Sequence, residues 1–154
     1  MAQRLVIYDS FFGNTAKIAE AIAEAIDAAS VKNISEVDQT DLDGLEVLFV
    51  GSPTRAFRPT PAITTFLKEL PKNHLAGVKA AAFDTRIGPD QINSGFLRLM
   101  IKLFGYADKI IAKQLAKAGA ELPLESEGFS VTDTEGPLAE DEIERAKAWA
   151  KKIL

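Results

Sequence analysis

Three continuous apolar runs constrain this chain more than any other feature of its sequence. They occupy residues 5–8, 47–50 and 80–83, the last within a strand expected over residues 78–83. A polar stretch that contains Gly, Pro or hydroxyl side chains follows each of them. Strands that are buried on both faces read as unbroken apolar runs, so these segments predict the central strands of a parallel sheet. Amphipathic helical patterns lie between the runs, and such alternation favours a sheet covered by helices on both faces. The predicted fold class is therefore α/β, a three-layer doubly wound parallel sheet.

The remaining elements follow from periodicity and from the positions of Gly and Pro. A helix is expected over residues 14–29, and residues 31–37 alternate as a half-exposed edge strand would. A second helix should begin near Thr60, with Pro61 at its first position. Two further helical patterns cover residues 97–104 and 110–118, and the final helix follows Pro137. We expect the last strand from residues 121–124 and 129–131, with a bulge between them.

Composition narrows the possible functions. The chain has 154 residues, which suggests one domain over residues 1–154. It contains no Cys and a single His, so thiolate chemistry is excluded and neither a metal site nor a catalytic dyad is expected. The net charge of −4 argues against nucleic acid as a partner. No apolar stretch is long enough for a membrane span or resembles a leader, so we expect a cytoplasmic protein.

The junction between the first strand and the first helix carries the strongest chemical signal. Residues 10–15 read Ser-Phe-Phe-Gly-Asn-Thr. The first N–H groups of a helix lack intrahelical partners and attract anions, and Ser10, Asn14 and Thr15 add side-chain donors while Gly13 lets the backbone close around an oxyanion. The alternative is a turn in which Ser10 or Asn14 merely caps the helix. The glycine patterns of nucleotide and dinucleotide loops are absent from the chain.

Two further loops should meet this junction. In a doubly wound sheet, ligands bind beyond the carboxyl ends of the strands, where residues 9–15, 51–60 and 84–90 are expected to converge. The second and third loops supply hydroxyl, aromatic and guanidinium groups: Thr54, Arg55, Phe57, Arg58, Thr85 and Arg86. This mixture suits a phosphorylated planar cofactor better than a metal ion or a polymer.

At this point the sequence resembles the flavodoxin family. Residues 10–15 are similar to the family's phosphate loop at Ser10, Gly13, Asn14 and Thr15, and residues 50–54 resemble the start of its second flavin loop. The tail from Glu135 to Leu138, with the charged helix after it, is also similar. The resemblance implies a five-stranded parallel sheet in the order 2-1-3-4-5, noncovalently bound FMN and one-electron transfer.

The resemblance also implies the cofactor-binding residues. The phosphate group would lie against the first loop, formed by Ser10, Phe11, Phe12, Gly13, Asn14 and Thr15. The isoalloxazine ring would lie between the second and third loops, at Pro53, Thr54, Arg55, Ala56, Phe57, Asp84, Thr85, Arg86 and Gly88.

The chain departs from the family pattern in three respects. Phe12 replaces the usual threonine, so one hydroxyl donor is lost. The stacking tyrosine and tryptophan of the ring loops are missing, so Phe11 or Phe57 must supply any stacking. Arg55, Arg58 and Arg86 make the ring loops unusually basic. Either these arginines stabilise the reduced, more negative flavin, or they point to water or pair with acidic groups of the protein surface.

These features support an electron carrier that exchanges single electrons with redox partner proteins, namely a reductase and an acceptor. We expect the chain to be a monomer. An FMN-dependent NAD(P)H:quinone or flavin reductase of the same fold is the first alternative. A flavin-free interaction module is the second. A phosphoacceptor receiver is disfavoured because residues 50–52, Val-Gly-Ser, offer no carboxylate.

Overall fold

The computed structural model describes residues 3–88 and 94–154. Five strands form one parallel sheet in the order β2-β1-β3-β4-β5, which confirms the predicted fold class and strand order. The strands are β1 (Gln3–Tyr8), β2 (Ser30–Asn33), β3 (Leu45–Pro53), β4 (Lys79–Ile87) and β5 (Glu127–Val131).

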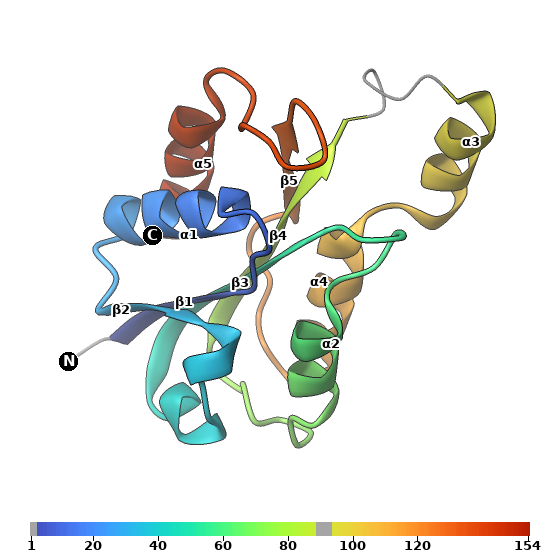
Figure 1. Ribbon diagram of the computed structural model, residues 1–154. Helices are drawn as coiled ribbons and strands as arrows, with labels where there is room; N and C mark the ends of the chain where they lie inside the picture. The colour runs from blue at the N-terminus through green and yellow to red at the C-terminus, as the bar shows by residue number, and fades with distance from the viewer. Residues whose placement is uncertain (1–2, 89–93) are drawn as a thin grey trace.

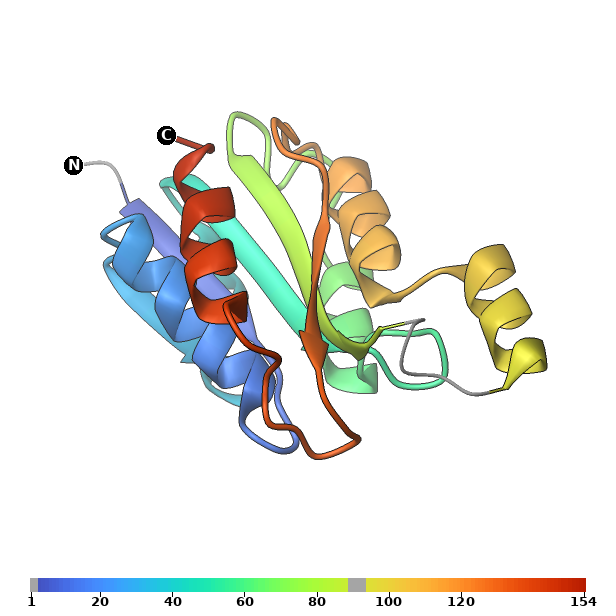
Figure 2. The ribbon, with the colours of Figure 1, turned by 90° about the horizontal axis from the view of Figure 1, so that it is seen from above.

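Helices cover both faces of the sheet. They are α1 (Asn14–Ala25), α2 (Pro61–Lys68), α3 (Gly95–Phe104), α4 (Ala107–Lys117) and α5 (Glu142–Lys151), with two short 3-10 helices, Ile34–Glu36 and Gln39–Leu42. Helices α1 and α5 lie on one face and α2 and α4 on the other (Figure 1). Helix α3 lies beyond the sheet, next to the start of α4 (Figure 2). Within the described ranges, no helix is long and apolar enough to cross a membrane.

The two faces of the sheet bury separate hydrophobic cores. Alternate residues of the central strands face opposite sides, so that Leu48 packs with α2 and α4 while Phe49 packs with α1 and α5. Trp149 of α5 lies edge-on to Phe49, with ring centroids 5.3 Å apart. Burial on both faces explains why these strands carry continuous apolar runs.

Two predicted elements are shorter than expected. The first helix ends at Ala25 rather than near residue 29. The edge strand ends at Asn33 because the Asn33 side chain accepts a hydrogen bond from Ser35 N–H and starts a 3-10 helix. The alternation over residues 31–37 is therefore a strand followed by a capped helical turn.

The last strand also differs from the prediction. It comprises Glu127–Val131 alone, and Glu121 pairs with Lys79 only through an isolated bridge. Pro123, in the segment between them, has no N–H group to donate to a ladder. The backbone of Glu125 instead accepts a hydrogen bond from Trp149 Nε1 at 3.2 Å.

Strands β3 and β4 are longer than their apolar runs. Ser52 pairs with Asp84 and Pro53 with Thr85, and β5 continues the ladder beside Arg86. Asp84, Thr85 and Arg86 thus lie on a strand and not in the predicted loop at residues 84–90. The end of that predicted loop, at residues 89 and 90, lies outside the described residues.

Candidate functional site

A cavity of about 240 Å³ opens at the carboxyl edge of the sheet. Its wall comes from the loop after β1, the loop after β3 and the end of β4, which are the segments that the sequence predicted to converge. The predicted residues that line the cavity are Ser10, Phe11, Phe12, Asn14, Thr15, Pro53, Thr54, Arg55, Ala56, Thr85 and Arg86. Such an edge is where doubly wound sheets bind their ligands.

The loop after β1 leaves the start of α1 open. Ser10 N–H donates to Asp9 Oδ1 at 2.9 Å, and Gly13 N–H donates to Ser10 Oγ at 3.0 Å. Gly13 is the N-cap residue, in the left-handed conformation at φ 90°, and no side chain caps the helix. The first turn also contains no acidic residue. The interpretation of Ser10 or Asn14 as a simple helix cap is therefore wrong, and the helix N-terminus retains its affinity for an anion.

Asn14 fastens this loop to the segment that follows β5. Its Nδ2 donates to the carbonyl oxygen of Glu135 at 3.0 Å. The next residue, Gly136, lies so close that a Cβ added there would come within 2.6 Å of Asn14 Oδ1. Only a glycine therefore allows this approach, and the contact ties the first loop of the chain to the last.

Thr15 connects the same loop to β4. Its hydroxyl and that of Thr85 lie 2.6 Å apart, and both side chains are buried. One of the two hydroxyl hydrogens occupies this bond, so the pair retains one donor. Since both residues line the cavity, that donor is available to a ligand.

The loop after β3 turns sharply beside the cavity. Arg55 and Arg58 exchange two backbone hydrogen bonds of 2.9 and 3.0 Å. Between them, Ala56 and Phe57 have φ values of 48° and 68°, a left-handed pair that bulky residues rarely adopt. The turn directs the Arg55 guanidinium over the Phe11 ring, 4.9 Å from its centroid. It also sets Phe57 against Phe104 of α3, away from the cavity.

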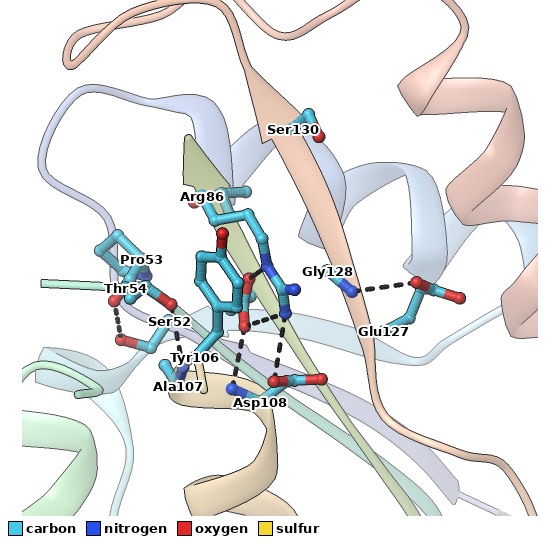
Figure 3. Close-up of polar contacts among 12 residues, drawn as sticks. Ser52, Pro53, Thr54, Arg86, Tyr106, Ala107, Asp108, Glu127, Gly128 and Ser130 are labelled. Atoms are coloured by element: carbon cyan, nitrogen blue, oxygen red, sulfur yellow. Dashed lines mark hydrogen bonds and ion pairs between the residues drawn. The ribbon is translucent and has the colours of Figure 1, made fainter. Parts of the chain in front are cut away.

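Arg86 holds a buried charge cluster beneath the cavity (Figure 3). Its Nε and Nη2 donate to the two carboxylate oxygens of Asp84 at 2.7 and 2.6 Å, and Nη2 also lies 3.1 Å from Asp108 Oδ1. The guanidinium covers the Tyr106 ring at 3.7 Å from its centroid. On the other side it passes so close to Gly128 that a side chain there would overlap it.

The cluster also fills the N-terminus of α4. Asp108 N–H donates to Asp84 Oδ2 at 2.9 Å, and Ala107 N–H donates to Thr54 Oγ1 at 2.9 Å. Burial raises the pKa of Asp84 to about 7, against the opposing effect of its hydrogen bonds from Arg86. Two carboxyl groups share one guanidinium, so the cluster carries no net positive charge when Asp84 is protonated and a negative one when it is ionised. The prediction that Arg86 makes the ring loops basic is corrected accordingly.

Four of the predicted site residues lie outside the cavity wall. Gly13 shapes the loop behind it, Phe57 faces α3, Asp84 is buried beneath Arg86, and Gly88 follows the end of β4. The structure adds Ile87, Val131 and Thr134 to the wall. Thr134 belongs to the loop that follows β5. A prediction that placed three loops at this edge could have included that loop, since the last strand of a parallel sheet ends there too.

Comparisons with known proteins agree with this geometry. Oxidised Flavodoxin 2 from Bacillus cereus superposes with a TM-score of 0.77 and 24% identity, covering 99% of this chain and 97% of that one. A flavodoxin from the domain Archaea gives a TM-score of 0.73 and 21% identity, covering 98% and 95%. The flavodoxin, WrbA-like protein from Agrobacterium tumefaciens gives 0.74 and 18%, covering 99% and 95%. These likenesses establish the fold.

The sequence itself provides the family assignment. A comparison with curated proteins finds no significant match. The sequence model of the flavodoxin domain, however, matches residues 5–87, which is more than half of the chain and includes the loops after β1 and β3 and the whole of β4. The chain therefore belongs to the flavodoxin domain family.

Proposed function

We propose that this protein binds FMN noncovalently and carries single electrons between redox partner proteins, a reductase and an acceptor. Membership of the flavodoxin family implies a flavin cofactor. The observation that supports FMN in particular is the open N-terminus of α1, which has neither a side-chain cap nor an acidic residue in its first turn and adjoins the cavity. A terminal phosphate is an anion that such a helix end binds readily.

The first loop would hold the phosphate. The backbone N–H groups of the first turn, the Ser10 hydroxyl and the donor shared by Thr15 and Thr85 are the groups available to it. Ser10 Oγ already accepts from Gly13 N–H, so its own hydrogen is free to donate outward. Phe12, which replaces a hydroxyl residue, contributes its backbone N–H and half-exposed ring.

The second loop and the end of β4 would hold the ring system. Pro53, Thr54 and Ala56 line one part of the cavity, and Thr85 lines another. Phe11 and Phe12 are the aromatic residues that line the cavity, and the Arg55 guanidinium lies over the Phe11 ring. FMN supplies the one-electron chemistry when it is bound. Arg55 is exposed and would favour the negative charge that reduction adds, whereas the paired Arg86 would not.

An absorbance experiment tests the cofactor. The purified protein is mixed with FMN, desalted and examined for the flavin bands, and then titrated potentiometrically. We expect retained flavin and two separate one-electron steps. Thr15→Val should weaken FMN binding about tenfold because it removes a buried hydroxyl from a charge-assisted hydrogen bond. Thr65→Val, an exposed threonine of α2, is the matched control and should bind as the parent does.

The same sample separates the alternatives. Steady oxidation of NAD(P)H in the presence of a quinone, together with a single two-electron step in the potentiometric titration, would favour the reductase over the carrier. A colourless protein after desalting would leave only the flavin-free interaction module. The proposal includes a monomeric, cytoplasmic carrier, which size-exclusion chromatography and cell fractionation test directly.

A further inference from the structure

Helix α3 differs from the other four α-helices of the described residues because it contains no buried residue. Phe96 is 69% exposed and Leu103 is 66% exposed, and Leu97, Leu99 and Phe104 are also exposed. Both ribbon views place the helix beyond the edge of the sheet, apart from the two helical layers (Figures 1 and 2). Large apolar side chains that are gathered on a single exposed element indicate a contact surface.

The side chains of α3 are sorted around its axis. At 3.6 residues per turn, its seven apolar residues occupy an arc of about 200°. Arg98 and Lys102, one turn apart, occupy the remaining side with Gly95. Residues 94–107 contain no Asp or Glu. A short helix with Phe and Leu on one side and cations on the other has the composition of helices that lie in a membrane interface.

The loop after β3 extends this surface. The rings of Phe104 and Phe57 pack with centroids 6.1 Å apart, and Arg58 shares a hollow with Met100 and Phe104. Arg55 and Arg58 are exposed in the same turn. Cations thus gather on and beside α3, although the whole chain has a net charge of −4. This local excess of positive charge is complementary to an anionic surface.

A second copy of the chain fits α3 poorly. The helix is about 15 Å long and about 10 Å wide with its side chains, far less than the roughly 800 Å² per partner that stable dimers bury. A two-fold contact would also bring Lys102, Arg55 and Arg58 near the same residues of the other copy. A flat anionic lipid surface avoids this repulsion and can accept a wide apolar arc.

We propose that α3 binds reversibly to anionic lipid surfaces. Its apolar side would enter the boundary between headgroups and acyl chains, while Lys102, Arg55 and Arg58 would remain at the level of the lipid phosphates. The loop between β3 and α2 would then face the membrane. Ala56 lines both the cavity and the hollow beside α3, so the cofactor site would lie next to the lipid surface. The lipid contact itself does not depend on the identity of the cofactor.

Vesicle flotation tests the proposal with the FMN-loaded protein of residues 1–154. The probes are vesicles of phosphatidylcholine alone and vesicles of equimolar phosphatidylcholine and phosphatidylglycerol. We expect binding to the mixed vesicles at low salt, and its loss at about 1 M salt, where the Debye length is about 3 Å. The double variant Leu99→Gln, Leu103→Gln should bind at least about tenfold more weakly. Lys102→Gln should bind about fivefold more weakly to the mixed vesicles.

Two controls match these variants. Leu154, which is 60% exposed at the other end of the chain, is replaced as Leu154→Gln, and the exposed Lys151 as Lys151→Gln. Both should float as the parent does. The flavin spectrum of each sample is recorded in parallel, so a failure to bind FMN is scored separately from a failure to bind lipid.

Three results would overturn the lipid proposal. The first is no flotation with either kind of vesicle. The second is equal binding to neutral and anionic vesicles that salt leaves unchanged. The third is a concentration-dependent dimer, seen by analytical ultracentrifugation, that the double variant Leu99→Gln, Leu103→Gln abolishes and that added vesicles do not dissociate.

Discussion

Helices α1 and α4 begin at the same edge of the sheet, but side chains of the protein bind the N-terminus of α4 and leave that of α1 open. The first N–H groups of α4 donate to Thr54 Oγ1 and to the Asp84 carboxylate. The first turn of α1 has no side-chain cap and no acidic residue, and it adjoins the cavity. The same electrostatic feature is therefore satisfied internally in one helix and left for an external anion in the other.

The carboxylate at the N-terminus of α4 is costly to bury and needs a partner charge. A carboxylate that enters the protein interior loses its hydration, and Asp84 is fully buried. Arg86 offsets part of that loss with two hydrogen bonds, and a second carboxylate, Asp108, shares the guanidinium. An external anion avoids this permanent cost, because it enters only when bound. A helix N-terminus therefore indicates a ligand only where the chain provides no anion of its own.

Removing the Arg86 guanidinium should disrupt the charge cluster at the N-terminus of α4 and produce the largest change in stability. Arg86→Met leaves Asp84 and Asp108 buried without their cation, so we expect the free energy of unfolding to fall by about 3–5 kcal/mol. Urea denaturation followed by circular dichroism measures it. Arg58→Met, at an exposed arginine, should change stability by less than about 0.5 kcal/mol. If Arg86→Met lowers the free energy of unfolding by less than about 0.5 kcal/mol, as the control does, the cluster does not stabilise the start of α4.

Removing the phosphate from the ligand tests the proposed anion site at the N-terminus of α1. FMN and riboflavin differ by the phosphate alone, and two or more charge-assisted hydrogen bonds should make FMN bind at least about 100-fold more tightly. Flavin fluorescence titration gives both dissociation constants. Ser10→Ala should reduce the preference for FMN while leaving riboflavin affinity unchanged. Equal affinities in the parent protein would place the phosphate elsewhere than at α1.

The pH dependence of stability tests the internal carboxyl group, and it is the smallest effect when it is counted per pH unit. The pKa of Asp84 is raised from 3.8 to about 7 on folding. Between these values the folded protein binds more protons than the unfolded chain, so this group makes stability fall as pH rises, by at most about 1.4 kcal/mol per pH unit.

Asp84→Asn should remove that contribution, and thermal unfolding between pH 4 and about 7 measures the difference between variant and parent. Asp43→Asn, at an exposed aspartate, is the control and should leave the slope unchanged. A difference between parent and Asp84→Asn that does not vary with pH would mean that Asp84 stays ionised throughout.

Much of the fold could be predicted because its signals are local. Leu48 and Phe49 stand in one apolar run since each faces its own core, and this burial on two faces is visible in the sequence. The ends of the elements were harder. Asn33 ends β2 through a hydrogen bond to Ser35, a capping choice that competes with the alternation of residues 31–37.

The candidate site was predictable where a loop acts by its own backbone. Gly13 and its neighbours could be assigned from a strand, a glycine and a helix in succession. The role of Arg86 could not, because Arg86 lies on β4 and its role depends on Asp108, which belongs to α4. The left-handed pair at Ala56 and Phe57 carries no glycine, so its turn has no local signal.

The hydrogen bond from Asn14 to Glu135 bears on how this domain could be divided. The family match ends at residue 87, yet the loop that would receive a phosphate is held by a segment near the other end of the chain. A fragment of residues 1–87 would contain the phosphate loop but lack Glu135, which accepts the hydrogen bond from Asn14. A fragment that begins after β4 would contain Glu135 but lack the loop. Split halves of this protein should therefore regain a shaped phosphate loop only when they reassemble, which makes flavin retention a natural reporter of fragment complementation.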